Sequence, residues 1–398
     1  MQYRKRQARA RQRMERGGVE ALLISHLPNV RYLCGFSGSN ALLLLAPTQT
    51  ILFTDGRYRE QARTEVMGAS VVVPPKGDLW KAAAAKAAKL KRVGLDSDHV
   101  TVTQRSRWLA SWSGRAAGLK SASGWIEPLR AVKDPEEIEA IERAVRLASS
   151  AFAPTLKRCR PGVSETELAG WLEFNLRRAG GEGLAFETIL AGGAHGALVH
   201  AQPGRQPLPH RGRRQLGGAR NASGRTLPGF EARAPSDQRE RPGQKVASHF
   251  VVMDYGVVLA GYHSDMTRTV HLGRPDRKAQ TVYRAVLEAQ LAAIAAVRPG
   301  VTGATVDAAA RSVLRQAGFA RYFPHSTGHG VGLEIHEAPR IASTATGEND
   351  RLQTGQVVTI EPGVYIPGWG GVRIEDVVLV TAQGAKVLTP TPKDLIVL

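Results

Sequence analysis

The sequence predicts an α/β domain over residues 1–128 followed by an α+β domain over residues 129–398, with the second domain built from two related halves. Three observations carry this prediction. The chain has 398 residues, which is more than one ordinary domain holds. Predicted strands and helices alternate through its first third. Later, segments 160–180 and 298–318 are identical at eight of 21 positions, at an offset of 298 − 160 = 138.

The first domain begins with an Arg-rich amphipathic helix over 4–17, which ends at two glycines. After it, short runs rich in Val, Ile, Leu and Phe are typical of strands, and helix-forming segments separate them. This alternation predicts a largely parallel sheet. The strands are expected at 19–25, 41–47, 50–55, 71–75 and 92–97, and the helices within 26–40, 55–63 and 78–90.

The second domain begins with a helix that carries strong start signals. Asp134 is a candidate N-cap, Pro135 occupies the first helical position, and Glu136 and Glu137 follow in the first turn. Each of the two related segments then reads as a turn, an N-cap, an amphipathic helix and a terminating glycine. A helix over 277–297 should precede the second segment, as the Asp134 helix precedes the first.

Carboxylates occur in this domain where burial would be costly. In residues 250–270, FVVMDYGVVLAGYHSDMTRTV, Asp254 lies among apolar strand residues and Asp265 lies on the strand after a turn. A buried carboxylate needs a partner, and two on neighbouring strands can share a cation. The alternative is that Asp254 caps the turn and Asp265 begins a loop. The second half favours the cation, because it repeats the pattern with Glu361 and Glu375.

The spacing of these carboxylates indicates an insertion in the first half. Their offsets, 361 − 254 = 107 and 375 − 265 = 110, are 28 to 31 residues shorter than the helix offset of 138. His200 and His336 are still 136 residues apart, so the extra residues lie between His200 and Asp254. The segment at about 211–248 lacks periodicity and is rich in Gly, Pro and Arg, which predicts a flexible surface insertion.

The predicted ligand set combines four carboxylates and one imidazole: Asp254, Asp265, His329, Glu361 and Glu375. Structural zinc sites favour Cys and His, so this set is atypical of them. It suits two divalent ions such as Mn²⁺ or Co²⁺ and, less selectively, Zn²⁺ or Fe²⁺. Two such ions about 3.5–4 Å apart can activate water and stabilise charge on a carbonyl oxygen. The chemistry expected of such a site is hydrolysis of an amide.

The motifs resemble those of a known family. DYG…SDMTRT, HSTGHGVGLEIHE, EPGVY and VRIED are similar to the signature segments of the pita-bread metallopeptidases, which include methionine aminopeptidase, Xaa-Pro aminopeptidase, prolidase and creatinase. NVRYLCGFSGSNALLLL and TDGRY resemble the creatinase/prolidase-type N-terminal domain. The resemblance spans nearly the whole chain except the insertion. It implies a mixed sheet in the first domain and a pita-bread catalytic domain with internal pseudo-two-fold symmetry.

The resemblance also implies a role for each residue of the ligand set. All five would hold a pair of divalent ions, most readily Mn²⁺, with Asp265 and Glu375 bridging the two. Glu361 would in addition take the proton from the attacking water.

Four further residues would act on the substrate or on the ligands. By the same resemblance, His200 would bind the substrate or the tetrahedral intermediate. His336 would donate to the scissile carbonyl or the leaving proline nitrogen, and His325 would line the proline pocket. Arg373 would orient a ligand carboxylate or the nearby proton network. For His325 a packed loop histidine is the alternative. Surface or structural roles are expected for the other seven histidines: His26, His99, His195, His210, His249, His263 and His271.

The implied activity is hydrolysis of the Xaa-Pro bond at the N-terminus of short peptides by a homodimer. Loops decide between an Xaa-Pro aminopeptidase, which we favour at this point, and an Xaa-Pro dipeptidase. One alternative is a creatinase-like enzyme, which does not need the metals. Another is a non-catalytic binding module, although relatives of that kind typically lose ligands.

Charge and composition restrict the classes of partner and the compartment that we expect. The net charge is +19, but residues 1–16 contribute +6 and residues 205–249 contribute +7, so 13 of the 19 charges lie in two stretches. Neither stretch has the interleaved aromatic residues of a nucleic-acid site, and no nucleic-acid partner is expected. Two well-separated cysteines indicate a reducing compartment. The N-terminus lacks an apolar signal-type run, and no apolar stretch is long enough to span a membrane, so a cytoplasmic protein is expected.

Overall fold

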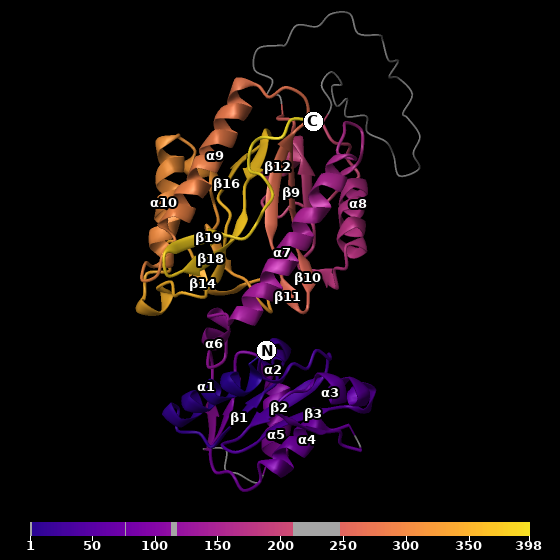
Figure 1. Cartoon of the computed structure of the whole chain (residues 1–398), viewed down its shortest axis with the longest axis vertical. Coiled ribbons are helices and arrows are strands. Elements are labelled where there is room, and N and C mark those ends of the chain that lie inside the picture. Colours follow the sequence, from indigo (N-terminus) through magenta and orange to yellow (C-terminus); the bar gives the residue numbers. More distant parts are fainter. Residues whose placement is uncertain (1, 76, 113–117, 210–246) are drawn as a thin grey trace, which may run out of the picture.

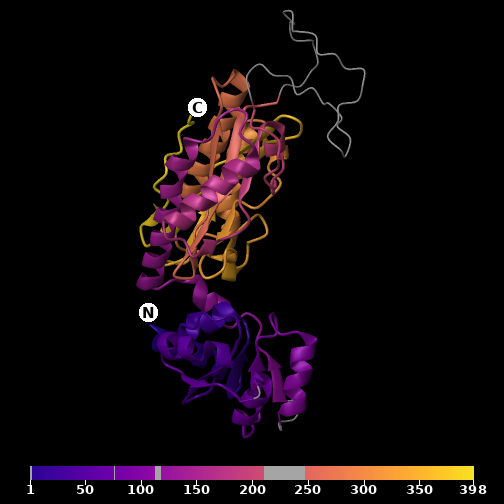
Figure 2. The same ribbon diagram turned by 90° about the vertical axis from the view of Figure 1, so that its right-hand side faces the viewer.

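A computed structural model describes residues 2–75, 77–112, 118–209 and 247–398. The predicted insertion at about 211–248 therefore lies outside the described residues, except for its last two. Two parts of the molecule are visible in both views, with α6 (Glu127–Ala131) between them (Figures 1 and 2). The predicted boundary at 128/129 falls inside this helix.

The first part contains one six-stranded sheet in the order β4-β3-β2-β1-β5-β6. The pairs β3/β4, β1/β5 and β5/β6 are parallel, whereas β1/β2 and β2/β3 are antiparallel. The sheet is therefore mixed, as the family resemblance implies. Three of its five strand pairs are parallel, and β2 and β3 form a hairpin whose short turn leaves no room for a crossover helix. The strands are β1 (Ala21–Ile24), β2 (Ala41–Leu45), β3 (Thr50–Thr54), β4 (Ser70–Val72), β5 (Val93–Leu95) and β6 (Leu119–Ser121).

Five further helices surround this sheet. They are α1 (Tyr3–Arg16), α2 (Leu27–Cys34), α3 (Arg59–Glu65), α4 (Leu79–Lys86) and α5 (Val102–Ser111). The sequence reasoning missed α5 and the three-residue β6. A start signal for α5 was present, because Thr101 and Gln104 form a reciprocal capping box.

Two pairs of helices flank the strands of the second part, α9 and α10 on one side and α7 and α8 on the other (Figure 1). Their bounds are α7 (Pro135–Leu156), α8 (Glu165–Arg178), α9 (Arg277–Ala296) and α10 (Gly303–Gln316). The predicted start of α7 is confirmed, because Asp134 Oδ1 accepts from the Glu137 backbone N at 3.0 Å and Glu137 Oε2 accepts from the Asp134 backbone N at 3.0 Å. In the two related segments, Ser164 and Thr302 cap the equivalent helices α8 and α10.

The strands of the second part repeat one arrangement in each half. In the first half, β9 pairs antiparallel with β12 while β10 and β11 form a hairpin between them. In the second half, β15 pairs antiparallel with β18 while β16 and β17 form the hairpin. The first-half strands are β7 (Gly183–Leu184), β8 (Ile189–Gly192), β9 (Phe250–Tyr255), β10 (Val257–Leu259), β11 (Tyr262–His263) and β12 (Met266–His271). Those of the second half are β13 (Gly328–Gly330), β14 (Glu337–Ile341), β15 (Val357–Ile360), β16 (Gly363–Ile366), β17 (Gly370–Arg373), β18 (Asp376–Thr381) and β19 (Gly384–Val387).

The two parts share an apolar core and a buried polar contact. Leu22, Leu43 and Ile24 of the first sheet belong to the same buried cluster as Val331 and Val357 of the second part.

Across the described ranges, no helix has both the length and the apolar character needed to cross a membrane.

Candidate metal centre

Asp254 and Asp265 are brought together by the β9/β12 ladder. Asp254 is the penultimate residue of β9 and pairs in register with Thr267, and Asp265 immediately precedes β12 rather than lying on it. Both residues are buried: 7% of the surface of Asp254 and 5% of the surface of Asp265 is exposed to solvent. The apolar residues around Asp254 on β9 therefore hold its carboxylate inside the molecule.

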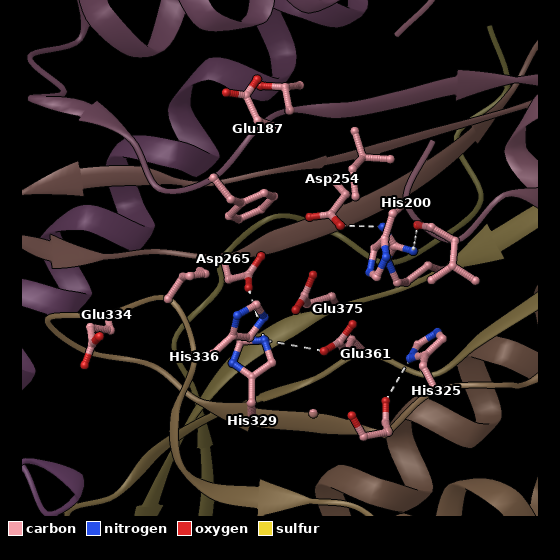
Figure 3. A pocket seen from close by; sticks show the side chains of 18 of the residues that line it. Glu187, His200, Asp254, Asp265, His325, His329, Glu334, His336, Glu361 and Glu375 are labelled. Carbon is pink, nitrogen blue, oxygen red and sulfur yellow. Dashed lines mark hydrogen bonds and ion pairs between the residues drawn. The ribbon is translucent and has the colours of Figure 1, made fainter. Parts of the chain in front are cut away.

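Glu361 and Glu375 occupy related positions in the other half. Glu361 immediately follows β15, and Glu375 immediately precedes β18. The last pairs of the two ladders are Tyr255 with Met266 and Ile360 with Asp376. Counted from these pairs, Asp265 and Glu375 are equivalent, whereas Asp254 and Glu361 differ by two positions. A shift of two residues keeps a side chain on the same face of a strand, so all four carboxylates lie on one side of the strands (Figure 3).

His329 enters this group from the neighbouring strand β13. Its Nδ1 lies 3.0 Å from the Gly330 carbonyl oxygen, so an Nδ1–H donates there and Nε2 carries the lone pair. Nε2 lies 3.5 Å from Glu361 Oε1 and 3.6 Å from Asp265 Oδ2. Burial lowers the pKa of His329 to about 4. The imidazole is therefore neutral at pH 7 and directs its lone pair at two carboxylates, which is the arrangement of a metal-binding histidine.

Close backbone contacts around His329 require glycine on both sides of it. A Cβ on Gly328 would lie 1.9 Å from the Thr359 carbonyl oxygen, and one on Gly330 would lie 2.2 Å from that of Ala338. No other residue fits at either position.

The electrostatics of the carboxylates favour a bound cation. Burial and the neighbouring carboxylates raise the pKa values of Asp265 and Glu375 well above the usual range. Burial, and then the charge of Asp254, raise the pKa of Glu361 to about 8, although Arg373 acts to lower it. Asp254 Oδ1 is buried and has no hydrogen-bond partner among the described residues. Four acidic groups with one orphaned oxygen favour divalent cations over four free carboxylates.

Three of these residues are placed closely enough to share one ion. Ligand atoms of Asp265, His329 and Glu375 all lie within 4.8 Å of one another. Asp254 and Glu361 lie beside these three residues. Together the five side chains offer four carboxylates and one imidazole, which are donors that hard or borderline divalent ions bind. The donor set therefore fits divalent metal ions.

Arg373 connects the two halves of this group. Its Nη2 donates to Asp254 Oδ2, and its Nε donates to Thr267 Oγ1 at 3.1 Å. Thr267 Oγ1 in turn donates to Glu375 Oε2 at 2.7 Å. The guanidinium also donates through Nη1 to the Tyr365 hydroxyl at 2.7 Å. One buried cation thus fixes Asp254 directly and Glu375 through a threonine.

The three remaining candidate histidines line the same cavity, whose volume is ≈ 1300 Å³. His336 and His200 are exposed to it, and the ring centroid of His336 lies 4.3 Å from that of His329. His325 is partly buried, and its Nε2 lies 2.9 Å from the Tyr365 hydroxyl. Burial lowers the pKa of His325 to about 4. Figure 3 shows the three rings on different sides of the carboxylate group.

The segment that carries His200 is fastened at both ends to Glu165, at the start of α8. The carboxylate of Glu165 accepts from the Gly192 backbone N at 2.8 Å and from the Gly204 backbone N at 2.9 Å. The Gln206 amide donates to it at 2.6 Å, and His195 Nδ1 lies 2.8 Å from its Oε2. His200 lies midway along the segment 192–206, so one buried carboxylate sets the position of the whole turn.

Sequence reasoning missed Tyr365, Thr267 and Glu165. Tyr365 lies within the EPGVY motif, and Thr267 lies two residues after Asp265, so the period of a strand could have placed Thr267 on the same face. No local pattern marks Glu165, because its partners are 27 to 41 residues away. His263, expected to have a structural role, donates its backbone N to the Gly332 oxygen at 2.8 Å.

Comparison with known proteins adds the family. Metallopeptidase family M24 matches residues 139–382, and the creatinase/prolidase N-terminal domain matches residues 6–132. The chain is 31% identical over 387 residues to an Xaa-Pro dipeptidase of Pyrococcus horikoshii, covering 96% of each protein. An Xaa-Pro dipeptidase from Bacillus anthracis has a similar structure, with a TM-score of 0.86 and 32% identity over 100% of both chains.

A second kind of enzyme has a similar structure. An X-Pro aminopeptidase from Thermotoga maritima has a TM-score of 0.81 and 30% identity over 97% of this chain and 100% of its own. The expected architecture, a creatinase-type domain with a mixed sheet followed by a pita-bread domain with two related halves, is confirmed. The chain therefore belongs to metallopeptidase family M24, and it is a pita-bread metallopeptidase with a creatinase/prolidase N-terminal domain.

Proposed function

We propose that this enzyme hydrolyses the Xaa-Pro bond of short peptides with two divalent ions held by Asp254, Asp265, His329, Glu361 and Glu375. The observation that carries the proposal is the convergence of four buried carboxylates and one neutral imidazole at the wall of a large cavity. The names of two relatives, both Xaa-Pro dipeptidases, support this choice of bond.

The ions would be held by residues whose positions are already fixed. Asp265 and Glu375, which are equivalent in the two halves, would hold the ions together with Asp254, Glu361 and His329. Bound ions of this kind supply Lewis-acid polarisation of a carbonyl group and lower the pKa of water. Arg373 keeps Asp254 oriented while the ligands carry the metal charge.

The proton transfers fall to side chains that face the cavity. Glu361 is the proposed acceptor of the proton from water, because its carboxylate lies within the ligand group. The nitrogen of a prolyl bond carries no hydrogen, so it must be protonated as it leaves. His336 and His200 face the cavity near the ligands and can donate to this nitrogen or to the carbonyl oxygen. His325 lines the cavity, is held by a hydrogen bond to the Tyr365 hydroxyl, and offers a wall for the proline ring.

Arg340 bears on the length of the substrate. It lines the cavity, its side chain is exposed, and no hydrogen-bond or ion-pair partner for it occurs in the part of the chain that the structure describes. A free guanidinium in a cavity suits a terminal carboxylate. We therefore propose the dipeptidase, in which proline is the last residue, ahead of the aminopeptidase that the sequence alone favoured.

The test compares an Xaa-Pro dipeptide with an Xaa-Pro-Yaa tripeptide, after chelation and return of Mn²⁺, Co²⁺ or Zn²⁺. The proposal predicts hydrolysis of the dipeptide and a smaller kcat/KM for the tripeptide. Arg340→Ala should lower kcat/KM for the dipeptide at least tenfold and leave the tripeptide little changed. Preference for the tripeptide would identify an aminopeptidase, and cleavage of neither peptide would overturn the proposal.

Several finer points belong to the same proposal. We propose Mn²⁺ as the native metal, because a carboxylate-rich set favours it. Homodimer assembly and the division of the chain at 128/129 are carried over from the family resemblance. A cytoplasmic location is proposed from Cys34 and Cys159, which are buried and unpaired.

A further inference from the structure

A second group of metal-ligating side chains lies at the rim of the cavity, on the first sheet. His26 follows β1 and His99 lies in the loop after β5. These strands are parallel neighbours, so the loops at their carboxyl ends lie side by side. Glu127, the first residue of α6, completes the group. No local pattern indicates this arrangement, because 73 residues separate the two histidines along the chain.

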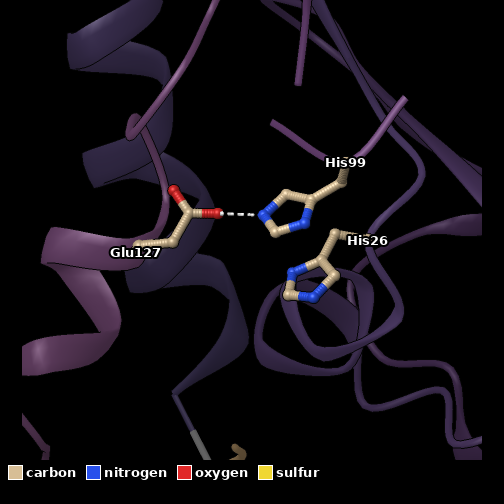
Figure 4. Close-up of side chains that lie close together, drawn as sticks. All are labelled: His26, His99 and Glu127. Carbon is tan, nitrogen blue, oxygen red and sulfur yellow. Dashed lines mark hydrogen bonds and ion pairs between the residues drawn. The ribbon is translucent and has the colours of Figure 1, made fainter. Parts of the chain in front are cut away.

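The three side chains are close enough to hold one ion. One ligand atom from each of His26, His99 and Glu127 lies within 4.8 Å of the other two. His99 Nε2 and Glu127 Oε1 share a hydrogen bond of 3.2 Å, and a bound ion would replace the proton between them. The imidazole rings are stacked, with centroids 3.5 Å apart (Figure 4).

His26 is oriented as a metal-binding histidine is. Its Nε2 lies 3.2 Å from Glu334 Oε1, a carboxylate that comes from the loop after β13 in the second part of the molecule. Its Nδ1 is buried and lacks any hydrogen-bond partner within the described residues. A carboxylate on one ring nitrogen fixes the tautomer in which the other nitrogen presents a lone pair. An unsatisfied buried nitrogen is costly, and an ion would satisfy it.

We propose that His26, His99 and Glu127 form a third metal site, selective for Zn²⁺, with Glu334 holding His26 in place. Two imidazoles, one carboxylate and a water make a four-coordinate set that zinc accepts. The rings must tilt out of their stack on binding, because the lone pairs lie in the ring planes. His99, Glu127 and Glu334 line the cavity, so an ion can reach the site from solvent.

Such an ion would connect the two parts of the molecule. Its ligands come from the first sheet and α6, and the carboxylate that orients His26 comes from the second part. The site lies on the rim of the cavity and not within the catalytic ligand group. Its occupancy should therefore change the metal content and thermal stability independently of the five proposed catalytic ligands.

The test counts zinc in the full chain. Metal-free protein is equilibrated with Zn²⁺ alone, and bound zinc per chain is measured by elemental analysis. His26→Ala/His99→Ala should bind one ion fewer than the wild type, while His249→Ala, a histidine outside both groups, should bind the same number. Asp265→Asn/Glu375→Gln should still bind one ion at the proposed site, and Zn²⁺ should raise its Tm.

Two results would overturn the proposal: unchanged zinc content in the double histidine variant, or no zinc in the Asp265→Asn/Glu375→Gln variant. If the double histidine variant fails to fold, Glu127→Gln replaces it and should again lose one ion. Because the readout is metal content, the result does not depend on peptidase activity.

Discussion

Buried charge dominates the chemistry of single residues in this enzyme. Asp254, Asp265 and Glu375 are almost fully removed from solvent, and within the described ranges Arg373 is the one cation in direct contact with Asp254. One guanidinium cannot neutralise four carboxylates. The group is therefore poised to gain cations, and removing a single member should alter activity far more than folding.

Glu361→Gln tests the proposed proton acceptor. The substitution keeps the shape of the side chain but removes its ability to take a proton, so kcat for the Xaa-Pro dipeptide should fall by roughly 10²–10⁴-fold. Steady-state kinetics measures the loss, and circular dichroism and metal analysis distinguish it from a loss of the fold or of an ion, because Glu361 is also a proposed ligand. Activity close to that of the wild type would remove Glu361 from this role.

The two cysteines give a prediction from pKa shifts. Burial raises the pKa values of Cys34 and Cys159 to about 12 each. The thiolate is the reactive form, so neither thiol should react with a thiol reagent in the native protein at pH 8, and two should react after unfolding. Because the unfolded thiols ionise near pH 9 and the folded ones near 12, stability should fall as pH rises through that interval. Rapid labelling of the native protein would contradict the burial.

Single residues were predictable from the sequence where burial conflicts with chemistry. An aspartate among Val251, Val252 and Met253 signals a partner, because an unpaired buried carboxylate is too costly. Local patterns do not identify the partner, since Arg373 is 119 residues from Asp254 along the chain, and it was the family resemblance that implied that Arg373 orients a ligand carboxylate. Local patterns identify the need for a contact, and the fold supplies the contact.

At the scale of elements, the start of α8 determines where His200 lies. Glu165, at 0% exposure, accepts hydrogen bonds from both ends of the segment 192–206. The Arg373 guanidinium also donates to the Val199 oxygen at 3.2 Å, next to His200. The turn is therefore held by a helix N-terminus from one side and by the ligand group from the other.

Glu165→Gln should displace this turn without removing any ligand. In the glutamine variant an amide NH₂ group, which is a donor, replaces one of the two oxygens that accept hydrogen bonds, so the hydrogen bonds from Gly204 N or Gln206 Nε2 are lost. Because the turn then shifts, kcat should fall at least tenfold while the metal content stays constant. Glu167→Gln, an exposed glutamate in the same helical turn, is the matched control and should behave as the wild type. In a His200→Ala background Glu165→Gln should cost little more, and a full additional loss there would mean that Glu165 acts elsewhere.

Elements with local start and stop signals were predictable. The capped helices α7, α8 and α10 lie where Asp134, Ser164 and Thr302 place them. The antiparallel pairs of the first sheet were not predicted, because strand direction depends on which strands pair, and no local pattern specifies that. The duplicated helices did predict the matching strand pairs of the two halves.

For the whole molecule, Arg130 is a principal link between the two parts. Arg130 is 2% exposed. Its guanidinium donates to Asn29 Oδ1 at 2.8 Å, to Glu334 Oε2 at 2.7 Å and to Glu337 Oε1. Glu337 also accepts from Lys133 at 3.0 Å. Arg130, Glu334 and Glu337 all line the cavity, and the side chains of Arg130 and Glu337 are 2% and 6% exposed, against 36% for Glu334.

Arg130→Ala should therefore lower the free energy of unfolding by about 3 kcal/mol, the lower end of the range for a broken buried ion pair, because Glu337 then keeps only Lys133 as a charged partner among the described residues. Arg146→Ala is the control, since Arg146 has a 57% exposed side chain 3.5 Å from Glu142 and should cost less than about 1 kcal/mol. Urea unfolding monitored by fluorescence compares the two. Equal losses would show that the buried contact adds nothing beyond a surface ion pair.

The internal duplication allowed the sequence to predict the symmetric ligand group across more than 100 residues. It could not predict how the first sheet is joined to that group, since the contacts of Arg130, His26 and Glu334 cross between parts that share no repeat. The proposed zinc site of His26, His99 and Glu127 could not be predicted for the same reason.

The most direct test of the account measures metal content and hydrolysis on the same samples. Chelated enzyme receives Mn²⁺ in steps, and the rate on an Xaa-Pro dipeptide is plotted against ions bound per chain. We expect no hydrolysis without metal and a rate that recovers as ions bind. In Asp265→Asn/Glu375→Gln the rate should not recover. Hydrolysis by the metal-free chain, or recovery in that variant equal to the wild type, would contradict it.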